Sequence, residues 1–257
     1  MSDSAPSGNA LEARSLQRSF GGIVAVNDVN LAVPRGQLRC IIGPNGAGKT
    51  TLFNLLTGRV RTQRGEILFE GKDITRLAPH RRCRIGIGRT FQINNVFPDA
   101  SVIDNVRLAL LAYHRRTWNM FTPAKTLLND EIDGVLDMVG LAQQRDRQAS
   151  QISYGDRRRL ELAIALACRP SLLLLDEPTC GMPLSDRPPL MALIQEIRKK
   201  TGMTVVLIEH DMDIVFSVAE RISVMHRGKL IADDTPAAIA ANPQVQEVYL
   251  GEDHGRA

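Results

Sequence analysis

A glycine-rich segment at residues 43–50 has the residue types and spacing needed to hold the phosphates of a nucleotide. It reads Gly-Pro-Asn-Gly-Ala-Gly-Lys-Thr, which fits the pattern G-x-x-x-x-G-K-[ST], between an expected strand and an expected helix. Glycines allow the backbone to fold around phosphates so that successive N–H groups point at negative charge. We therefore expect nucleotide binding by Gly43, Pro44, Asn45, Gly46, Ala47, Gly48, Lys49, Thr50 and Thr51.

Three side chains of this segment have more specific expected roles. Lys49 would reach the β- and γ-phosphates, the Thr50 hydroxyl would ligate Mg²⁺, and Thr51 would add a donor near the α-phosphate. The alternative is an ordinary glycine-rich turn between a strand and a helix. The four fixed positions and the correct flanking elements together favour a site for a nucleotide and Mg²⁺.

Two carboxylates, Asp176 and Glu177, follow a run of four leucines at residues 172–175. Such a run is typical of a buried strand, and in phosphate-loop enzymes the carboxylate at its end lies beside Mg²⁺. Glu177 is then placed to polarise a water for attack on the γ-phosphate. An acidic pair after an apolar run is more often a surface turn, but the phosphate loop earlier in the chain favours the catalytic interpretation.

A third segment, Ile152-Ser153-Tyr154-Gly155-Asp156, precedes a helix expected from about Arg157 to Ala167. Ser153, Gly155 and the free N–H groups of the helix start form a second anion site. Two phosphate-seeking helix starts for one nucleotide indicate a site that is shared across a dimer.

Together these motifs resemble the ATP-binding subunit of ABC transporters, and the resemblance covers nearly the whole chain. The Walker A motif of the family matches residues 43–50, its Walker B motif matches residues 172–176, and its catalytic glutamate matches Glu177. The resemblance also implies that Gln92 of the Q-loop is a ligand of Mg²⁺ and water. It further implies that His210 is the switch histidine that senses the γ-phosphate.

The resemblance assigns Phe20, in Ser-Phe-Gly-Gly, the role of stacking on adenine. Simpler interpretations remain open for all three residues that only the resemblance singles out. Gln92 alone would be a solvated loop residue, His210 alone a hydrogen-bonded histidine after a strand, and Phe20 a core residue.

Two motifs depart from the family pattern. Tyr154 and Asp156 replace the glycine and glutamine of the usual Leu-Ser-Gly-Gly-Gln signature, whereas the serine and the central glycine are kept. In the D-loop, Pro183 stands where Asp or Asn is common. These departures bear on communication across the dimer rather than on ATP binding.

A finer resemblance points to importers of branched-chain amino acids, a branch that also serves urea, short amides and other hydrophobic amino acids. It rests on residues 86–92, on the enlarged helical segment with Trp118 and Phe121, and on residues 248–252. The resemblance implies ATP and Mg²⁺ as cofactors and transmembrane permease subunits as partners. It also implies a second ATPase subunit, identical or paralogous, an indirect role for a solute-binding protein, and no nucleic acid.

The elements that must position these motifs indicate an α/β fold. We expect a P-loop NTPase core with a mainly parallel sheet, an N-terminal antiparallel β region and an inserted helical subdomain. Residues 1–13 are expected to be a flexible lead-in to a single domain at 14–257. Within that domain, the core would comprise 14–92 and 161–257, and the helical subdomain 93–160. A permease would dock near Gln92, Val96 and Phe97.

Composition sets the class of protein. Of 257 residues 44% are hydrophobic and 23% charged, which is typical of globular proteins, and 32 Lys and Arg against 28 Asp and Glu are too balanced for a dedicated DNA-binding protein. No apolar run reaches the ~18 residues of a membrane span, and no secretory signal is visible. Any membrane attachment must then come through a partner, and the resemblance to ABC transporter subunits implies a peripheral position on the cytoplasmic face of the inner membrane.

Two other functions remain open at this point. One is a soluble ATPase of the same superfamily that acts on nucleic acid or the ribosome, although such relatives carry coiled coils or tandem cassettes that are absent from this sequence. The other is a P-loop small-molecule kinase or a GTPase. A GTPase would carry Asn-Lys-x-Asp, which is absent, and a kinase would not need the segment from Ser153 to Asp156.

Overall fold

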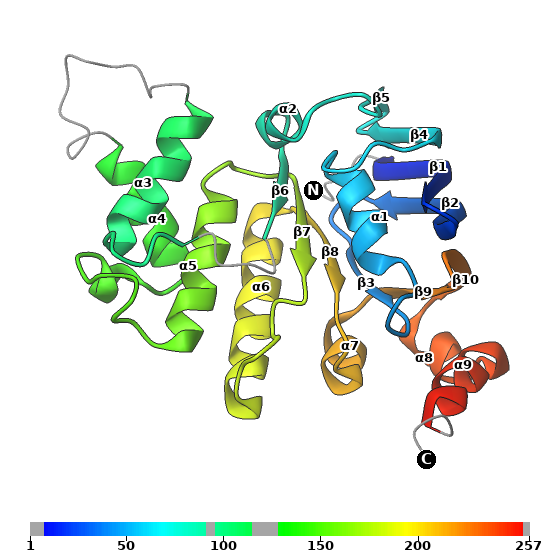
Figure 1. The fold of residues 1–257 in the computed structure, drawn as a ribbon. Coiled ribbons are helices and arrows are strands. Elements are labelled where there is room, and N and C mark those ends of the chain that lie inside the picture. The colour runs from blue at the N-terminus through cyan, green and yellow to red at the C-terminus, as the bar shows by residue number, and fades with distance from the viewer. Residues whose placement is uncertain (1–7, 91–95, 115–127, 254–257) are drawn as a thin grey trace, which may run out of the picture.

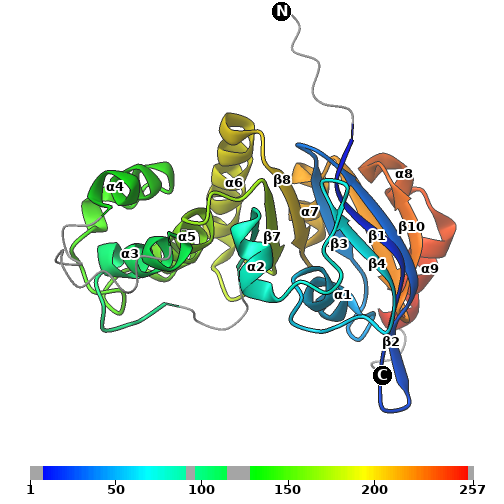
Figure 2. The same cartoon turned by 90° about the horizontal axis from the view of Figure 1, so that it is seen from above.

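Two β-sheets and a lobe of helices make up the computed structural model, which describes residues 8–90, 96–114 and 128–253. The helical lobe, the larger sheet and the smaller sheet follow one another across the molecule (Figures 1 and 2). This arrangement confirms the expected α/β fold with an antiparallel N-terminal region and inserted helices.

The smaller sheet is antiparallel, with the order β2-β1-β4-β5. Its strands are β1 (Asn9–Phe20), β2 (Ile23–Pro34), β4 (Arg64–Phe69) and β5 (Lys72–Asp73). The expected flexible lead-in at 1–13 is wrong from residue 9 onward, because Leu11 and Ala13 are buried and pair with both β2 and β4. The alternation of buried and polar residues is that of a half-buried strand, and the sequence analysis missed it.

The larger sheet has the order β10-β9-β3-β8-β7-β6. Its strands are parallel except for β10, which forms a hairpin with β9. They are β3 (Leu38–Ile42), β6 (Ile87–Arg89), β7 (Leu172–Asp176), β8 (Thr204–Ile208), β9 (Arg221–His226) and β10 (Lys229–Asp234). The three central strands are buried along their whole length, including Arg39 of β3, and the apolar run at residues 172–175 predicts this for β7.

The helices pack on the two faces of this larger sheet or form the helical lobe beside it. They are α1 (Lys49–Leu56), α2 (Pro79–Arg84), α3 (Val102–Tyr113), α4 (Asn129–Met138), α5 (Tyr154–Leu166), α6 (Arg187–Thr201), α7 (Met212–Val218), α8 (Pro236–Ala240) and α9 (Pro243–Asp253). Alternate strand residues point to opposite faces. One face packs with α1 and the smaller sheet, and the other packs with α5, α6 and α7.

The helical lobe consists of α3, α4 and the first half of α5. The boundary expected at residue 160 falls inside α5, so it coincides with no end of an element. Leu160 and Leu162 belong to the same apolar cluster as Leu173 of the sheet, and α5 therefore joins the lobe to the core. Within the described residues, every helix is too short or too polar to cross a membrane.

Candidate functional site

The phosphate loop lies between β3 and α1, where the sequence analysis placed it. Gly43 and Gly48 have φ of +149° and +100°. A Cβ on Gly43 would lie 2.1 Å from the carbonyl oxygen of Met225, and a Cβ on Gly48 would lie 2.1 Å from that of Ala25. Both contacts are with backbone, which cannot move aside cheaply, so the loop can take this path only with glycine at the two positions.

Lys49 folds back over this loop. Its Nζ donates to the carbonyl oxygens of Gly43 at 2.6 Å and Pro44 at 2.9 Å, and the side chain is almost fully buried. The ammonium is thus held on the concave side of the loop, next to the N–H groups at the start of α1. A phosphate that binds there meets the lysine and a helix N-terminus together.

The turn between β9 and β10 supports the loop from behind. Gly228 N donates to the carbonyl oxygen of Ala47 at 2.9 Å, and Asn27 N donates to that of Gly228 at 2.8 Å. Arg227 in the same turn lines the cavity described next. Arg227 was not among the predicted site residues, and the Arg-Gly-Lys sequence at residues 227–229 was the only available signal.

A cavity of 420 Å³ brings the predicted residues together, and this volume is in the range of small-molecule sites. It is lined by Ile23, Val24, Ala25, Asn45, Gly46, Ala47, Gly48, Lys49, Thr50, Thr51, Glu177, His210 and Arg227. The convergence follows from strand order. The phosphate loop, Glu177 and His210 follow β3, β7 and β8, which are neighbouring parallel strands whose carboxyl ends meet at one edge.

Glu177 and His210 are in direct contact, with 2.5 Å between Oε1 and Nε2. Glu177 takes a left-handed backbone conformation, φ +50°, and its N–H donates to the carbonyl oxygen of Ile208 at 3.0 Å. The end of β8 therefore fixes the direction in which the Glu177 side chain leaves β7. The carboxylate and the imidazole face the cavity as a pair.

Glu209, which the sequence analysis missed, holds this pair in place from behind. It is buried, and its Oε1 accepts from the N–H of Thr179 at 3.1 Å and from its hydroxyl at 2.6 Å. Its Oε2 accepts from the N–H of His210 at 3.1 Å. A glutamate directly after an apolar run was the available signal, and one sequence cannot distinguish such a residue from a solvated one.

Asp176 is buried at the end of β7 and forms an ion pair with Arg89 of β6, 3.0 Å between Oδ2 and Nη2. Burial raises the pKa of Asp176, and the guanidinium of Arg89 opposes that rise. Within the described residues Oδ1 is buried without a hydrogen-bond partner. A carboxylate oxygen in that state is suited to Mg²⁺, which prefers hard oxygen ligands.

The other expected Mg²⁺ ligands are placed only in part. Thr50 lies exposed at the start of α1 and lines the nucleotide cavity. Gln92 lies outside the described residues, although Thr90 just before it is described. The described residues contain no cluster of three or more acidic, His or Cys side chains that could hold a metal by itself. Such a small donor set is usual for Mg²⁺, which is bound through few side chains plus substrate phosphates.

Phe20 lies at the end of β1, half-exposed, with the Arg18 guanidinium carbon 4.7 Å from its ring centroid. Ile23, its partner in the β1–β2 register, lines the cavity, whereas Phe20 is not among the described lining residues. The aromatic ring is therefore near the site rather than in it, and adenine stacking by Phe20 stays a prediction.

The second anion site lies at the start of α5. Ser153 is the N-cap: its Oγ accepts from Asp156 N at 3.0 Å and donates to Asp156 Oδ2 at 2.9 Å. The Ser153 hydroxyl thus caps the helix and is itself held by the Asp156 carboxylate, which gives the unusual Asp156 a structural role. Ser153 and Gly155 border a cavity of 230 Å³ that Met182 and Asp186 of the D-loop region also line.

Tyr154, the other departure from the signature pattern, contacts the loop that follows Glu177. Its hydroxyl donates to the carbonyl oxygen of Cys180 at 2.9 Å, and Arg158 Nη2 donates to the same oxygen at 2.8 Å. Cys180 N in turn donates to the carbonyl oxygen of Glu177 at 3.1 Å. The start of α5 is thus tied by hydrogen bonds to the loop that follows Glu177 in the same chain.

Comparison with known proteins identifies the family. Residues 26–180 match the family model described as ABC transporter. The chain belongs to the ABC transporter family. Its end, residues 229–255, matches a second model, described as Branched-chain amino acid ATP-binding cassette transporter.

Curated relatives of this ABC protein align over almost its whole length. BraF of Pseudomonas aeruginosa, a high-affinity branched-chain amino acid transport ATP-binding protein, is 40% identical over 252 residues, which cover 94% of this chain and 98% of BraF. LivG of Escherichia coli K12, which carries the same description, is 38% identical with the same coverage.

Solved structures agree with the fold. A nucleotide-free ATP-binding cassette from an ABC transporter has a TM-score of 0.82 and 28% identity, covering 94% of this chain and 98% of that one. The ADP conformation of the ATP-binding cassette MJ1267 also has a TM-score of 0.82 and 28% identity, covering 95% and 99%. The protein is therefore the nucleotide-binding ATPase subunit of an ABC transporter. The soluble-ATPase and kinase alternatives are not favoured by these matches.

Proposed function

We propose that this ABC ATPase drives an importer of branched-chain or other hydrophobic amino acids from the cytoplasmic face of the inner membrane. The match of residues 229–255 to the branched-chain amino acid family model carries the proposal. The described part of this segment, residues 229–253, contains β10, α8 and α9, and none of its residues is among the described lining of the 420 Å³ cavity. BraF and LivG, which are described as ATP-binding proteins of branched-chain amino acid transport, support the same assignment.

Nucleotide chemistry in this proposal is divided among the residues of the 420 Å³ cavity. Lys49 and the N–H groups of residues 43–51 bind the phosphates, and Phe20 stacks on adenine. Mg²⁺ would be held by Thr50, Asp176 and Gln92, and when bound it neutralises phosphate charge. Glu177 orients and polarises the attacking water, since its carboxylate faces the cavity. His210, 2.5 Å from Glu177, positions that carboxylate and senses the γ-phosphate.

Hydrolysis in this account takes place in a dimer. Ser153 and Gly155 of one subunit would cover the γ-phosphate held by the phosphate loop of the other, because the cavity at the start of α5 is separate from the chain's own nucleotide cavity. ATP then closes the dimer, and loss of the γ-phosphate reopens it. The second subunit is an identical or a paralogous ATPase chain.

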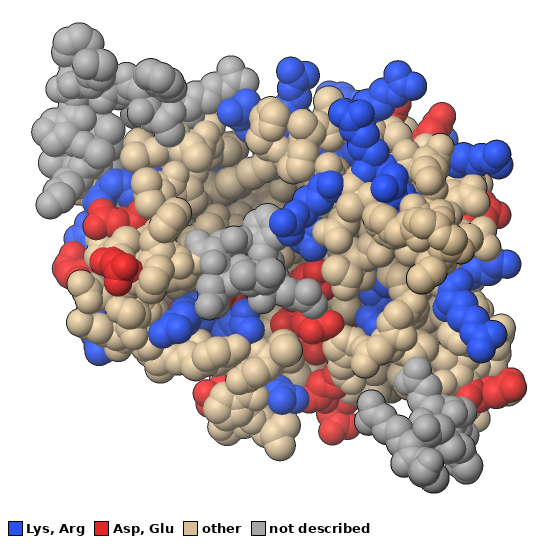
Figure 3. Space-filling model, viewed as in Figure 1, with Lys and Arg blue, Asp and Glu red and all other residues tan. Residues whose placement is uncertain are grey.

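Transmembrane permease subunits are the proposed partners, with a solute-binding protein acting through them. A cavity of 320 Å³ between α2, β6, α3 and α5 offers a docking site, and Figure 3 shows a hollow between the helical lobe and the core that basic side chains border. Phe97 is exposed at the entry to α3 and offers a second candidate contact, outside the described lining of this cavity. Val96 does not, because it is buried in the helical lobe beside Val102.

Uptake measurements test the proposal. In the host cell, replacing the gene by the Glu177→Gln variant should abolish high-affinity uptake of labelled leucine, isoleucine and valine. Uptake of labelled glutamate serves as the control and should be unchanged. If leucine uptake were the same in the variant and the wild type, the assignment to hydrophobic amino acids would be wrong.

A further inference from the structure

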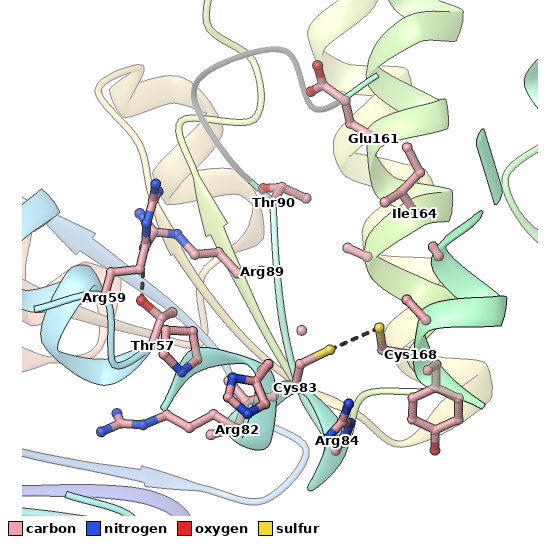
Figure 4. A pocket seen from close by; sticks show the side chains of 18 residues that line it. Thr57, Arg59, Arg82, Cys83, Arg84, Arg89, Thr90, Glu161, Ile164 and Cys168 are labelled. Carbon is pink, nitrogen blue, oxygen red and sulfur yellow. Dashed lines mark hydrogen bonds between the residues drawn. The ribbon is translucent and has the colours of Figure 1, made fainter. Parts of the chain in front are cut away.

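Two cysteines lie side by side in the cavity between α2 and α5. Cys83 is on α2, Cys168 lies just after the end of α5, and both side chains line this cavity. The Cys83 thiol donates a hydrogen bond to the Cys168 sulfur, with 3.0 Å between the two Sγ atoms (Figure 4). They are 85 positions apart in the chain, so their spacing gave no sign of the pairing.

We propose that Cys83 and Cys168 form a redox-active dithiol site, which closes into a reversible disulfide across the seam between α2 and α5. The chemistry of this site is independent of the proposed transport function. Its effect on coupling, argued below, rests on that function.

The distance favours a disulfide over a metal site. A disulfide requires an S–S separation of about 2.05 Å, so the two sulfurs need to approach by only about 1 Å. Two thiolates on one tetrahedral zinc lie about 3.8 Å apart, given Zn–S bonds of about 2.3 Å. The pair is therefore closer than a metal would hold it, and the described residues offer no cluster that would complete a metal site.

The surroundings also favour reaction at Cys83. Once Cys83 ionises, the Cys168 thiol becomes the donor, and this hydrogen bond, together with the charge of Arg84, lowers the pKa of Cys83 to about 7 against the opposing effect of burial. A large share of Cys83 is then thiolate at neutral pH, and the thiolate is the nucleophile. Cys40 contrasts with it, because burial raises the pKa of that thiol.

Hydrogen peroxide is a sufficient oxidant. The Cys83 thiolate attacks one peroxide oxygen, the O–O bond breaks, and Cys83 becomes a sulfenic acid while hydroxide leaves. The Cys168 sulfur then attacks the Cys83 sulfur and displaces the second hydroxide, which takes up the Cys168 proton to form water. In total, two thiols lose two electrons and one peroxide becomes two waters. A small thiol such as dithiothreitol reverses the step by exchange.

Closing the disulfide would tie the end of the signature helix to α2. Cys168 follows the helix whose first residues form the second anion site, and Cys83 lies in the core on the other side of the cavity. If a permease segment docks in this cavity, a covalent link between α2 and the end of α5 fixes two walls of the docking site and opposes any adjustment of the cavity to that segment. Oxidation should therefore lower permease-coupled ATP hydrolysis.

Mass spectrometry of the full chain tests the site. The Cys180→Ser variant removes the exposed cysteine and serves as the background. After limited peroxide and alkylation in denaturant, we expect a loss of about 2 Da, a Cys83–Cys168 cross-linked peptide and full reversal by dithiothreitol. Adding Cys168→Ser is the matched control, and it should give a sulfenic or further oxidised Cys83 instead.

Three outcomes would overturn the proposal: two unmodified thiols, overoxidised Cys83 without the loss of 2 Da, or a disulfide between molecules. The effect on coupling is measured in the transporter complex as the ratio of oxidised to reduced ATP hydrolysis. This ratio should fall severalfold for the Cys180→Ser background and stay near one when Cys83→Ser is added. A ratio near one in both would overturn the coupling effect. Failure of hydrophobic amino acid uptake would instead overturn the proposed function and leave the thiol chemistry intact.

Discussion

At the scale of single residues, Lys49 carries the positively charged side chain of the phosphate loop. Its ammonium is buried against two carbonyl oxygens of that loop, so it is held in position before a nucleotide arrives. Because the ammonium is already in place, little free energy is needed to reorient it when negative charge shifts among the phosphate oxygens during hydrolysis. The loop should therefore depend strongly on this one side chain.

Lys49→Ala should lower ATP hydrolysis at least ~100-fold and greatly weaken ATP binding, because the main side-chain charge on the β- and γ-phosphates is lost. Phosphate release and binding of a fluorescent ATP analogue measure the two effects. Lys199→Ala on the exposed face of α6 is the matched control and should change neither. Turnover near that of the wild type in Lys49→Ala would contradict the assigned role.

Arg89 provides the counter-charge for another residue of the site, because it forms an ion pair with buried Asp176. The same guanidinium donates to Asn54 at 2.8 Å and Thr57 at 2.9 Å, so it links α1 to the end of β7. Arg89→Met should lower the free energy of unfolding by about 3–5 kcal/mol, because it leaves the Asp176 carboxylate buried without its counter-charge. Urea unfolding measures this. Arg89→Lys should recover part of the loss, and equal stability of all three proteins would contradict the account.

The sequence predicted the parts of the site that lie on continuous motifs, and it missed those that depend on long-range contacts. The phosphate loop, Glu177 and His210 converge as expected, since neighbouring parallel strands deliver them to one edge. Glu209, Arg89 and Arg227 were missed. Each acquires its role from a strand or turn far away in the chain, and local residue patterns carry no record of such contacts.

At the scale of elements, apolar runs and cap residues account for many of the strands and helix ends. The helix after the phosphate loop ends before Gly58, which is left-handed as a stop residue should be, and Thr235 caps α8. The start of β1 was missed because Leu11 and Ala13 lie among small and charged residues, and their burial comes from pairing with strands on both sides. The surface proposed for permease docking likewise forms only when several elements pack together, so no local sequence pattern predicts it.

Phe97, at the entry to α3, provides the test of the docking surface. Phe97→Glu should leave ATP binding unchanged but abolish uptake, because a charge replaces an exposed aromatic ring at the proposed permease contact. The matched control is Phe216→Glu on α7, where another exposed phenylalanine lies outside that surface. Normal uptake with Phe97→Glu would show that the permease docks elsewhere.

At the scale of the whole molecule, the two anion sites explain why this ATPase should work as a pair. The chain's own phosphate loop and the start of α5 line separate cavities, and Gly155, next to the N-cap Ser153, borders the second cavity. A γ-phosphate bound by both chains provides a contact that exists with ATP and disappears with ADP. Dimer formation should therefore depend on the nucleotide.

The most direct measurement is size-exclusion chromatography with light scattering on Glu177→Gln, which keeps the side-chain size but removes the carboxylate proposed to polarise water. With ATP we expect a species of twice the 28.3 kDa of one chain, and with ADP a single chain. Adding Ser153→Arg should prevent the dimer, since it places bulk in the shared site without touching the phosphate loop. A dimer that forms regardless of nucleotide and of Ser153→Arg would contradict the shared site. A protein that stays monomeric with ATP, both alone and when co-expressed with a related ATPase chain, would also contradict the shared site.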